Sequence, residues 1–450
     1  MLYRKIESYI REYLTSDSNK ILIIDGARQI GKSYIINSVG EELFKDKYIK
    51  INLLENPNVA RMFEKVTTVE DFYFTLSTIA GDKMGDKNDT LIFLDEIQVC
   101  PNLITLLKFL KQDNKYKFIA SGSLLGVTLA NTASIPIGYI EIKRMYQLDF
   151  EEFLLANGFS HEAIKVLEEK FTSKETLDEA LHTRLMDLFK KYLIVGGLPD
   201  AVNEFISSRN VSKIRKIHQD IIQLYGEDAG QYDRERKLKI KRIYDMIPST
   251  MQNTKKRIVV KDIENIKGKR YSSYADEFDY LISSGITHEV KAISNPVFPL
   301  LQSEDKNLLK LYMNDVGLLS ALLYRNNTTA IMNDIRSINL GALYETVVAC
   351  QLKALGHKLF YYDNRKNGEV DFLIDDFDNL AVLPVDVKSG RDYTIHSALN
   401  HFLSNGSYPV KSAIVLSNER EIKTVNNITY LPIYFTMFLK PMQQDEDVII

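Results

Sequence analysis

The 450-residue sequence predicts an α/β protein that begins with a phosphate-binding parallel sheet and ends in a second α/β domain. Three observations predict this fold class. A glycine-rich loop follows an apolar strand near the N-terminus, a second apolar strand ends in paired acids, and two strands in the last 115 residues carry acids and a lysine. Strand and helix patterns alternate over the first 150 residues, as they do in βαβ units.

The glycine-rich loop at residues 26–33 has the pattern G-x-x-x-x-G-K-[ST] and follows the apolar run at residues 21–24. This spacing lets backbone N–H groups point at phosphates and places them at the N-terminus of a helix. We expect Lys32 to reach the β- and γ-phosphates of ATP and Ser33 to hold Mg²⁺. The predicted nucleotide-binding residues of this loop are Gly26, Ala27, Arg28, Gln29, Ile30, Gly31, Lys32 and Ser33.

The strand at residues 91–95 ends in Asp95 and is followed by Glu96. Phosphoryl transfer depends mainly on positioning and charge neutralisation, so we expect Asp95 to assist Mg²⁺ and Glu96 to orient the attacking water. A third apolar run ends in Ser121 and Ser123, whose hydroxyls could sense the γ-phosphate because ligands bind at the carboxyl ends of parallel strands. These two serines could equally be ordinary turn residues.

Composition excludes several other classes of protein. A formal net charge of -3 argues against a uniformly basic coat for nucleic acid. Cys100 and Cys350 have no metal-ligand spacing, which favours a reducing compartment without disulfides or a thiolate zinc site. The N-terminus lacks an apolar signal region and no segment approaches 18 consecutive apolar residues, so we expect a cytoplasmic protein without a membrane span.

The expected strands of the first domain lie at 21–25, 48–53, 91–95, 117–121 and 139–148. A strand between the phosphate loop and the Asp-Glu strand is typical of the P-loop ATPase branch that includes the AAA+ group. Apolar periodicity predicts helices after residue 150, which could form a lid. The full prediction is α/β: a P-loop AAA+ parallel sheet domain at 1–149, a helical lid at 150–233, a winged-helix-like middle at 234–335 and a restriction-endonuclease-like α/β domain at 336–450.

Between residues 234 and 270, 13 Lys or Arg residues stand against four acids. Helical patterns followed by the alternating stretch 286–290 give the element order of a winged helix. DNA would then face Lys267, Lys269 and Arg270. A solvated charged face on an ordinary helical domain is the alternative.

The last 115 residues contain a second candidate site. Asp371 lies on an alternating strand, Asp386 and Lys388 form a D-x-K pair on one face of the next strand, and Glu345 lies on an apolar helix upstream. This arrangement is typical of restriction-endonuclease-like nucleases, in which carboxylates bind Mg²⁺ and a lysine helps to activate water. The predicted metal ligands of the chain are Ser33, Asp95, Glu345, Asp371 and Asp386, and the predicted catalytic residues are Glu96, Lys32, Asp371, Asp386 and Lys388.

Several motifs together resemble a prokaryotic AAA-type ATPase family whose C-terminal half is a domain of unknown function. The motifs span 26–33, 94–98, 121–123, 192–199, 310–319 and 341–345. The resemblance implies an ATP-binding domain, a winged-helix-like middle and a nuclease-like C-terminal fold. In that family a basic residue often follows the glycine before the fifth strand, whereas this chain has Gly138 and Tyr139, which leaves Arg144 and Arg28 as candidates for an arginine finger.

We therefore expect a Mg²⁺-dependent ATPase coupled to a DNA-directed C-terminal domain that could cut DNA. DNA contacts are expected through residues 234–270 and the C-terminal domain, and a homo-oligomer is a candidate assembly. The alternative is a nucleotide-dependent switch whose inactive nuclease-like domain binds a partner protein.

Overall fold

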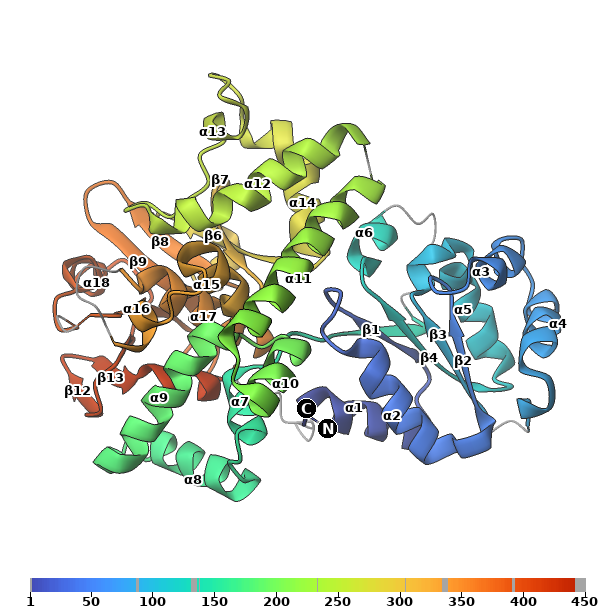
Figure 1. Cartoon of the computed structure of the whole chain (residues 1–450). Helices are drawn as coiled ribbons and strands as arrows, with labels where there is room; N and C mark the ends of the chain where they lie inside the picture. The colour runs from blue at the N-terminus through green and yellow to red at the C-terminus, as the bar shows by residue number, and fades with distance from the viewer. Residues whose placement is uncertain are drawn as a thin grey trace. The chain divides into compact units, whose positions relative to one another are not determined.

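The computed structural model describes residues 2–85, 89–130, 136, 138–232, 234–303, 305–333, 339–390 and 393–441. The chain divides into two compact units (Figure 1). Unit 1 comprises Met1–Tyr146 with Ser283–Gly285, and unit 2 comprises Gln147–Ile282 with Ile286–Ile450. Among the described residues, no helix is long and apolar enough to cross a membrane.

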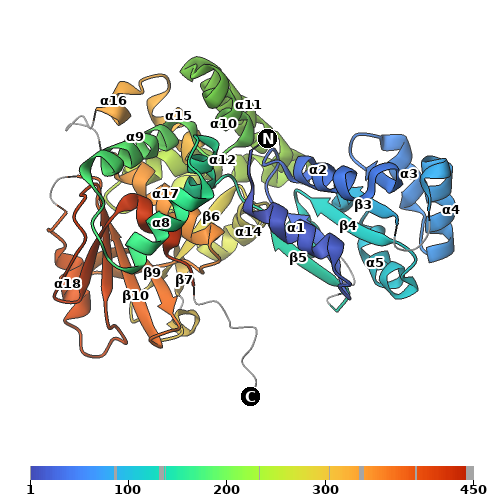
Figure 2. The ribbon, with the colours of Figure 1, turned by 90° about the horizontal axis from the view of Figure 1, so that it is seen from below.

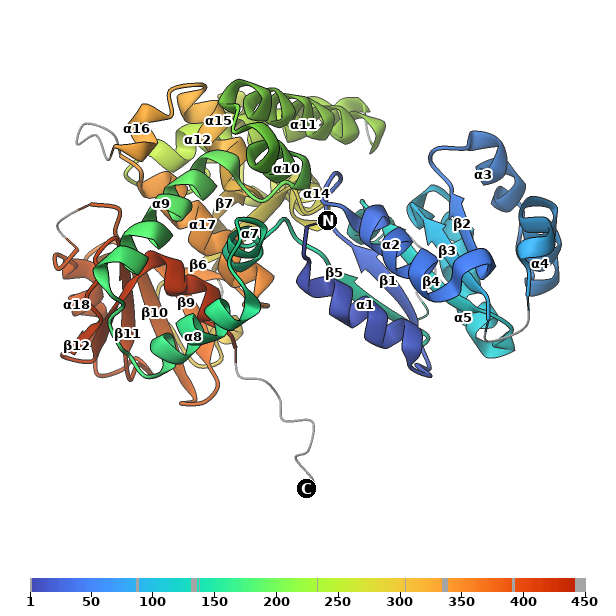
Figure 3. The same ribbon diagram turned by 60° about the horizontal axis from the view of Figure 1, so that its bottom comes forward.

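Unit 1 is built on a parallel five-stranded sheet with strand order β2-β3-β4-β1-β5. Figure 3 shows these strands side by side. Their bounds are β1 Ile21–Asp25, β2 Tyr48–Asn52, β3 Leu91–Asp95, β4 Lys117–Gly122 and β5 Ile140–Arg144. β4 lies between the strand that precedes the phosphate loop and the strand that ends in Asp95, which confirms the predicted P-loop AAA+ sheet.

The inner strands β1 and β3 of unit 1 are apolar because both of their faces are covered, whereas the edge strand β5 is largely polar. β1 and β3 are buried at all five positions. The helices are α1 Lys5–Thr15, α2 Lys32–Phe44, α3 Pro57–Glu64, α4 Val69–Ala80, α5 Pro101–Asp113 and α6 Leu125–Ala130, with short 3-10 helices at Lys45–Lys47, Gly81–Lys83 and Ile97–Val99. α1 packs against α2, and α5 contributes five buried residues to a core shared with α4 and the strands. The sheet thus holds the carboxyl ends of all five strands at one edge.

Helices dominate the first half of unit 2. They are α7 Phe150–Ala156, α8 His161–Thr172, α9 Glu179–Val195, α10 Pro199–Ser208, α11 Val211–Tyr232, α12 Arg234–Gln252, α13 Lys261–Glu264 and α14 Ala275–Ser283, followed later by α15 Val316–Tyr324, α16 Thr329–Met332, α17 Gly341–Ala354 and α18 Ser397–Leu403. α7 begins at a capping box, because Asp149 and Glu152 each bind the backbone N–H of the other. The 3-10 helices of this unit are Tyr271–Tyr274, Leu300–Ser303 and Ile433–Phe438.

Unit 2 also holds an eight-stranded mixed sheet with order β12-β13-β11-β10-β9-β8-β6-β7. The strands are β6 Thr287–Ile293, β7 Asp305–Met313, β8 Phe360–Asn364, β9 Gly368–Asp376, β10 Ala381–Val387, β11 Ala413–Ser417, β12 Lys423–Val425 and β13 Ile428–Pro432. α17 packs on β6, β7 and β10, and α18 packs on β9 (Figure 2). This second sheet confirms an additional α/β region in the C-terminal half.

The predicted division near residue 335 does not separate two structural units. β6 and β7 form the expected antiparallel hairpin, but β6 also pairs in parallel with β8 through Lys291 and Phe360. The hairpin therefore extends the C-terminal sheet instead of standing as the wing of a separate domain. Unpaired backbone groups on the edge of β8 explain this addition, since a neighbouring strand satisfies them. The predicted boundary residues 233 and 335–336 lie outside the described residues.

A buried carboxylate joins two of the motifs that carry the family resemblance. Asp315 is 2% exposed and accepts hydrogen bonds from the N–H groups of Gly197, at 2.6 Å, and Leu318, at 3.1 Å. Burial raises the pKa of Asp315 to about 6, against the opposing effect of these N–H donors. Gly196 lies directly beside this carboxylate with φ +71°. The motif glycines are therefore required by packing within unit 2.

We predict that Gly196→Ala strongly destabilises unit 2. The new Cβ would lie 2.1 Å from Oδ1 of Asp315 in a backbone region that side chains rarely adopt, so the substitution should cost at least about 3 kcal/mol. Gly158→Ala is the matched control, because Gly158 also has a positive φ of +88° but has nothing within 4 Å of its Cβ position. It should cost about 1 kcal/mol. Urea unfolding of both variants measures the difference, and equal losses would contradict the packing argument.

Candidate functional site

The phosphate loop connects β1 to α2, and its backbone has positive φ angles at two glycines. Gly26 has φ +152°, and a Cβ there would lie 2.4 Å from the carbonyl oxygen of Met145. Gly31 caps the N-terminus of α2 with φ +93°, so both fixed glycines are needed for the turn. The backbone N–H groups at the start of α2 have no helical partners and suit an anion.

Lys32 lies inside this loop. Its side chain is buried, and Nζ donates to the carbonyl oxygens of Gly26, at 2.9 Å, and Ala27, at 2.8 Å. Burial lowers the pKa of Lys32, whereas the carboxylates of Glu96, Asp25 and Asp95 favour the charged form. The ammonium is thus held by neutral acceptors that phosphate oxygens can replace.

Asp95 is fully buried at the end of β3 and collects hydrogen bonds from three neighbouring elements. Ser33 Oγ donates to Oδ1 at 2.8 Å, and Ser121 Oγ donates to the same oxygen. Asn52 Nδ2 reaches Oδ2 at 3.3 Å, and Lys50 Nζ lies 3.4 Å from it. Ser33 and Asp95 place two oxygen ligands side by side, and this donor set fits Mg²⁺.

Glu96 has a left-handed backbone with φ +58°. Its Oε2 accepts hydrogen bonds from Ser123 Oγ, at 2.7 Å, and from Gln98 Nε2. Arg28 Nε donates to Ser123 Oγ at 3.3 Å, so a polar chain runs from the phosphate loop to the glutamate. A residue in a strained conformation that is held by two donors is typical of a functional position.

Most of the sequence-predicted residues of this site therefore lie close together, but not every side chain of the phosphate loop faces the site. Lys32, Ser33, Asp95, Glu96, Ser121 and Ser123 converge, whereas Gln29 is exposed and Ile30 is buried. The hydrogen bonds from Ser121 and Ser123 to the acids favour the functional interpretation of these serines over the turn alternative. Asn52 and Lys50 were missed, although a polar residue at the end of β2 was a detectable signal.

Arg144 ends β5 beside the phosphate loop. Its Nε lies 3.6 Å from Oδ2 of Asp25, the last residue of β1. Burial raises the pKa of Asp25, and the charge of Arg144 opposes that rise. Both candidates for an arginine finger, Arg144 and Arg28, therefore contact residues of their own nucleotide site.

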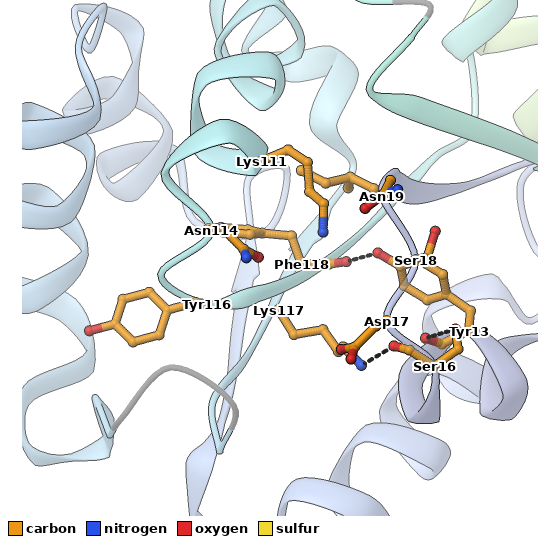
Figure 4. A pocket seen from close by; sticks show the side chains of 11 residues that line it. Tyr13, Ser16, Asp17, Ser18, Asn19, Lys111, Asn114, Tyr116, Lys117 and Phe118 are labelled. Carbon is orange, nitrogen blue, oxygen red and sulfur yellow. Dashed lines mark hydrogen bonds between the residues drawn. The ribbon is translucent and has the colours of Figure 1, made fainter.

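A pocket of about 390 Å³ lies at the opposite edge of the same sheet, where β1 and β4 begin (Figure 4). Lys117 Nζ there donates to the carbonyl oxygens of Leu14, at 2.6 Å, and Ser16, at 2.8 Å. Tyr13 OH donates to the carbonyl oxygen of Phe118 at 2.7 Å. Lys117 thus binds the C-terminal end of α1 and Tyr13 binds the start of β4. The phosphate loop lies at the other ends of the strands.

The acids and the lysine of the C-terminal candidate site also gather. Lys388 lies one residue beyond β10, and its Nζ is 2.9 Å from Oδ2 of Asp386. The N–H of Val387 donates to Oδ2 of Asp371 at 2.8 Å. Burial raises the pKa of Asp386 to about 8, and the neighbouring Asp371 carboxylate adds to the effect. Glu345 is 3% exposed and accepts a hydrogen bond from Tyr312 OH at 3.0 Å.

The predicted metal set Glu345, Asp371 and Asp386 does not fit a metal as it is arranged. Within the described ranges, no group of three or more His, Cys, Asp or Glu residues could hold a metal ion. Lys256 is ion-paired with Glu345, and Lys310 is ion-paired with Glu369. Sequence reasoning missed both lysines as partners of these acids. Lys256 belongs to no recognisable motif, and Lys310 begins the motif at 310–319 but was given no role there.

The basic stretch at residues 234–270 is partly neutralised within unit 2. At least six of its 13 Lys or Arg residues pair with acids. The pairs are Arg236–Asp276, Lys239–Glu277, Lys241–Asp245, Arg242–Glu264, Lys256–Glu345 and Arg257–Asp363. Lys267, Lys269 and Arg270 are exposed. Four of these acids, Asp276, Glu277, Glu345 and Asp363, lie outside residues 234–270. The net positive charge that this stretch presents is therefore smaller than the nine charges counted from its sequence.

Three family models match this chain. Residues 18–154 match a model described as an AAA domain, residues 186–329 match a domain of unknown function (DUF8612), and residues 340–436 match another domain of unknown function (DUF4143). These matches and the strand order of unit 1 agree on an AAA-type domain followed by regions without an assigned role.

Curated relatives are similar at low identity. An uncharacterised protein of Methanocaldococcus jannaschii is 23% identical over 362 residues, which cover 79% of this chain and 72% of the relative. An uncharacterised protein of Haemophilus influenzae is 24% identical over 230 residues, which cover 50% of this chain and 56% of the relative. The match to the second relative thus spans little more than half of its length.

Two solved structures are similar to this chain at low identity. The Aeropyrum pernix ORC1 protein in complex with DNA is 13% identical, with a TM-score of 0.29, 71% coverage of this chain and 90% coverage of that chain. The Saccharomyces cerevisiae Hsp104–ADP complex is also 13% identical with a TM-score of 0.29, covering 79% of this chain and 46% of that chain.

Proposed function

We propose that this chain, a prokaryotic-type AAA ATPase with C-terminal domains of unknown function, binds ATP and hydrolyses it with Mg²⁺. The proposal rests on one observation. Ser33 of the phosphate loop and Ser121 both donate to the buried carboxylate of Asp95 at the end of β3, next to Glu96. Phosphoryl transfer requires this combination of an anion-binding loop, a metal-binding pair and a carboxylate that can orient water.

The phosphate loop and α2 would bind the triphosphate through backbone N–H groups, while Lys32 exchanges its two carbonyl contacts for phosphate oxygens. Ser33 and Asp95 would hold Mg²⁺. When bound, Mg²⁺ would neutralise charge that develops on the phosphates. Ser121 keeps Asp95 in place through its hydrogen bond.

Glu96 would act as the base that orients the attacking water. Ser123 and Gln98 both donate to Oε2 of Glu96, which fixes the carboxylate and leaves its other oxygen for water. The polar chain from Arg28 through Ser123 gives the phosphate loop a direct connection to the base. Positioning of this kind can be tested separately from nucleotide binding.

We predict that Lys32→Ala abolishes ATP binding and that Glu96→Gln retains binding but loses turnover. The first change removes the buried cation at the phosphates, and the second keeps the shape of the side chain but removes its basicity, which should lower kcat by at least about 100-fold. Calorimetric ATP titration and phosphate release measure the two effects.

The exposed residues Lys20 and Glu64 supply matched controls. Lys20→Ala and Glu64→Gln should leave both assays unchanged. Unchanged hydrolysis in Glu96→Gln would refute Glu96 as the base, and wild-type affinity in Lys32→Ala would refute the assigned loop.

We further propose that unit 2 directs the ATPase to DNA, with Asp371, Asp386 and Lys388 as a nuclease-like centre. The proximity of these side chains supports this role. Lys267, Lys269 and Arg270 supply exposed positive charge for phosphate contacts. Neutralisation of the remaining basic stretch favours the alternative, a silent nuclease-like fold that binds a partner protein. The cytoplasmic location and a homo-oligomer remain predictions.

We predict that the triple variant Lys267→Ala, Lys269→Ala, Arg270→Ala weakens DNA binding and flattens its salt dependence. Each lost phosphate contact should reduce the slope of log affinity against log salt by about 0.9. Fluorescence anisotropy with a DNA duplex at several salt concentrations measures this slope. The control removes three exposed lysines elsewhere in unit 2, Lys165, Lys174 and Lys411. An equal loss in the control, or salt-independent binding of the wild type, would contradict a specific DNA surface.

Any cleavage of plasmid with Mg²⁺ or Mn²⁺ should be lost in Asp386→Ala and Lys388→Ala while DNA binding persists. Cleavage that survives both substitutions would exclude this centre as its source.

A further inference from the structure

Lys256 lies in the C-terminal acid cluster although it comes from a different part of the chain. It follows α12, 89 positions before Glu345 in α17, and the two side chains form an ion pair. The side chain of Lys256 is 15% exposed and that of Glu345 is 3% exposed, so water contributes little to their solvation. In such a buried pair each charge must be compensated by its partner, because an unpaired buried charge would strongly destabilise the fold.

The ammonium of Lys256 faces several carboxylates at once. Burial by itself would lower the pKa of Lys256, but the charges of Glu345, Asp371 and Glu369 together raise it. Lys256 and Lys310 likewise hold down the pKa of Asp371 against the effect of burial. Lys256 thus contacts Glu345 directly and is influenced by two further carboxylates, unlike the lysine of an ordinary surface salt bridge.

The segment that carries Lys256 is docked along its length. Arg257 forms an ion pair with Asp363 of β8 at 2.7 Å, and the N–H of Ile258 donates to the carbonyl oxygen of Leu309 in β7 at 3.0 Å. Ile258 is itself buried. The two residues that follow Lys256 are thus anchored on β8 and β7, and these anchors help to hold Lys256 at the acid cluster.

A second lysine reinforces this arrangement. Lys310 of β7 is fully buried, is ion-paired with Glu369 and lies 4.6 Å from the centre of the Tyr361 ring. Tyr312, also on β7, occupies the second oxygen of Glu345 at 3.0 Å. Glu345, one of the carboxylates that the sequence assigns to a metal, thus already has two partners from residues 234–335.

We propose that Lys256 is a tethered cation that takes the place of a divalent metal in this cluster. The ammonium of Lys256 excludes metal ions from this cluster while it is ion-paired with Glu345. This inference deepens the proposed nuclease-like centre and depends on its assignment. It also assigns Lys256 a regulatory contact that the D-x-K motif does not include.

The test measures Mn²⁺ binding by the full-length chain, without nucleotide or DNA, from the decrease in the electron paramagnetic resonance signal of free Mn²⁺. Wild type and Lys256→Arg should bind no Mn²⁺ in this cluster, because both keep the cation. Lys256→Gln should gain one Mn²⁺ site that is absent from both of these proteins. Adding Asp371→Asn to Lys256→Gln should remove the gained site, which separates it from any metal at the phosphate loop.

Lys255→Gln is the matched charge control, because Lys255 is exposed and precedes Lys256 directly. Arg257→Ala is a second route if Lys256→Gln does not fold, since it releases the segment without changing the cluster and should also raise Mn²⁺ affinity. Circular dichroism establishes folding of each variant.

Two outcomes would overturn the proposal. One is Mn²⁺ binding by the wild type as tight as that of Lys256→Gln and dependent on Asp371, because Lys256 would then be no barrier. The other is the absence of a new site in both Lys256→Gln and Arg257→Ala, because the cluster would then not be a cation site. A new Mn²⁺ site in a protein that cuts no DNA would instead refute only the nuclease function.

Discussion

The nucleotide site of unit 1 depends on the buried carboxylate of Asp95. It joins four elements, because Ser33 of α2, Ser121 of β4 and Asn52 of β2 donate to this single side chain at the end of β3. A carboxylate without exposure needs such donors, since an unpaired charge would be strongly disfavoured. The same contacts that stabilise the charge therefore fix the relative positions of the phosphate loop and the two serine hydroxyls.

The parallel sheet makes this convergence possible. All five strands place their carboxyl ends at one edge, so side chains that are 62 positions apart, Ser33 and Asp95, lie within 2.8 Å of each other. Glu96 leaves this edge with a left-handed backbone that turns its side chain toward Ser123. Local strain and buried hydrogen bonds together produce a preorganised site.

In unit 2 the buried charges are several carboxylates that lie close together. Its acid cluster is enclosed by the sheet and α17, and lysines from β7 and from the segment after α12 neutralise it. The β6–β7 hairpin both extends the sheet and delivers Lys310 and Tyr312 to the cluster. The docking of this hairpin on β8 therefore produces both the added strand pairs and the ion pair of Lys310. The contact of Asp315 with the loop at Gly197 shows that other motif residues of this unit serve packing.

The sequence by itself determined unit 1 almost completely. The phosphate loop, the strand at 91–95 and the Asp95–Glu96 pair are runs of consecutive residues, and their backbone geometry follows from glycine positions and apolar patterning. It also placed Asp386 and Lys388 together, because residues two apart share one face of a strand, and it assigned Asp371 of the preceding strand to the same site from the motif pattern. Only the tertiary structure decided that Lys256 and Lys310 fill the acid cluster, that the hairpin joins the C-terminal sheet and that much of the basic stretch is neutralised. Such pairings join side chains tens of positions apart, and a lysine that forms them has the same local sequence pattern as one that faces water.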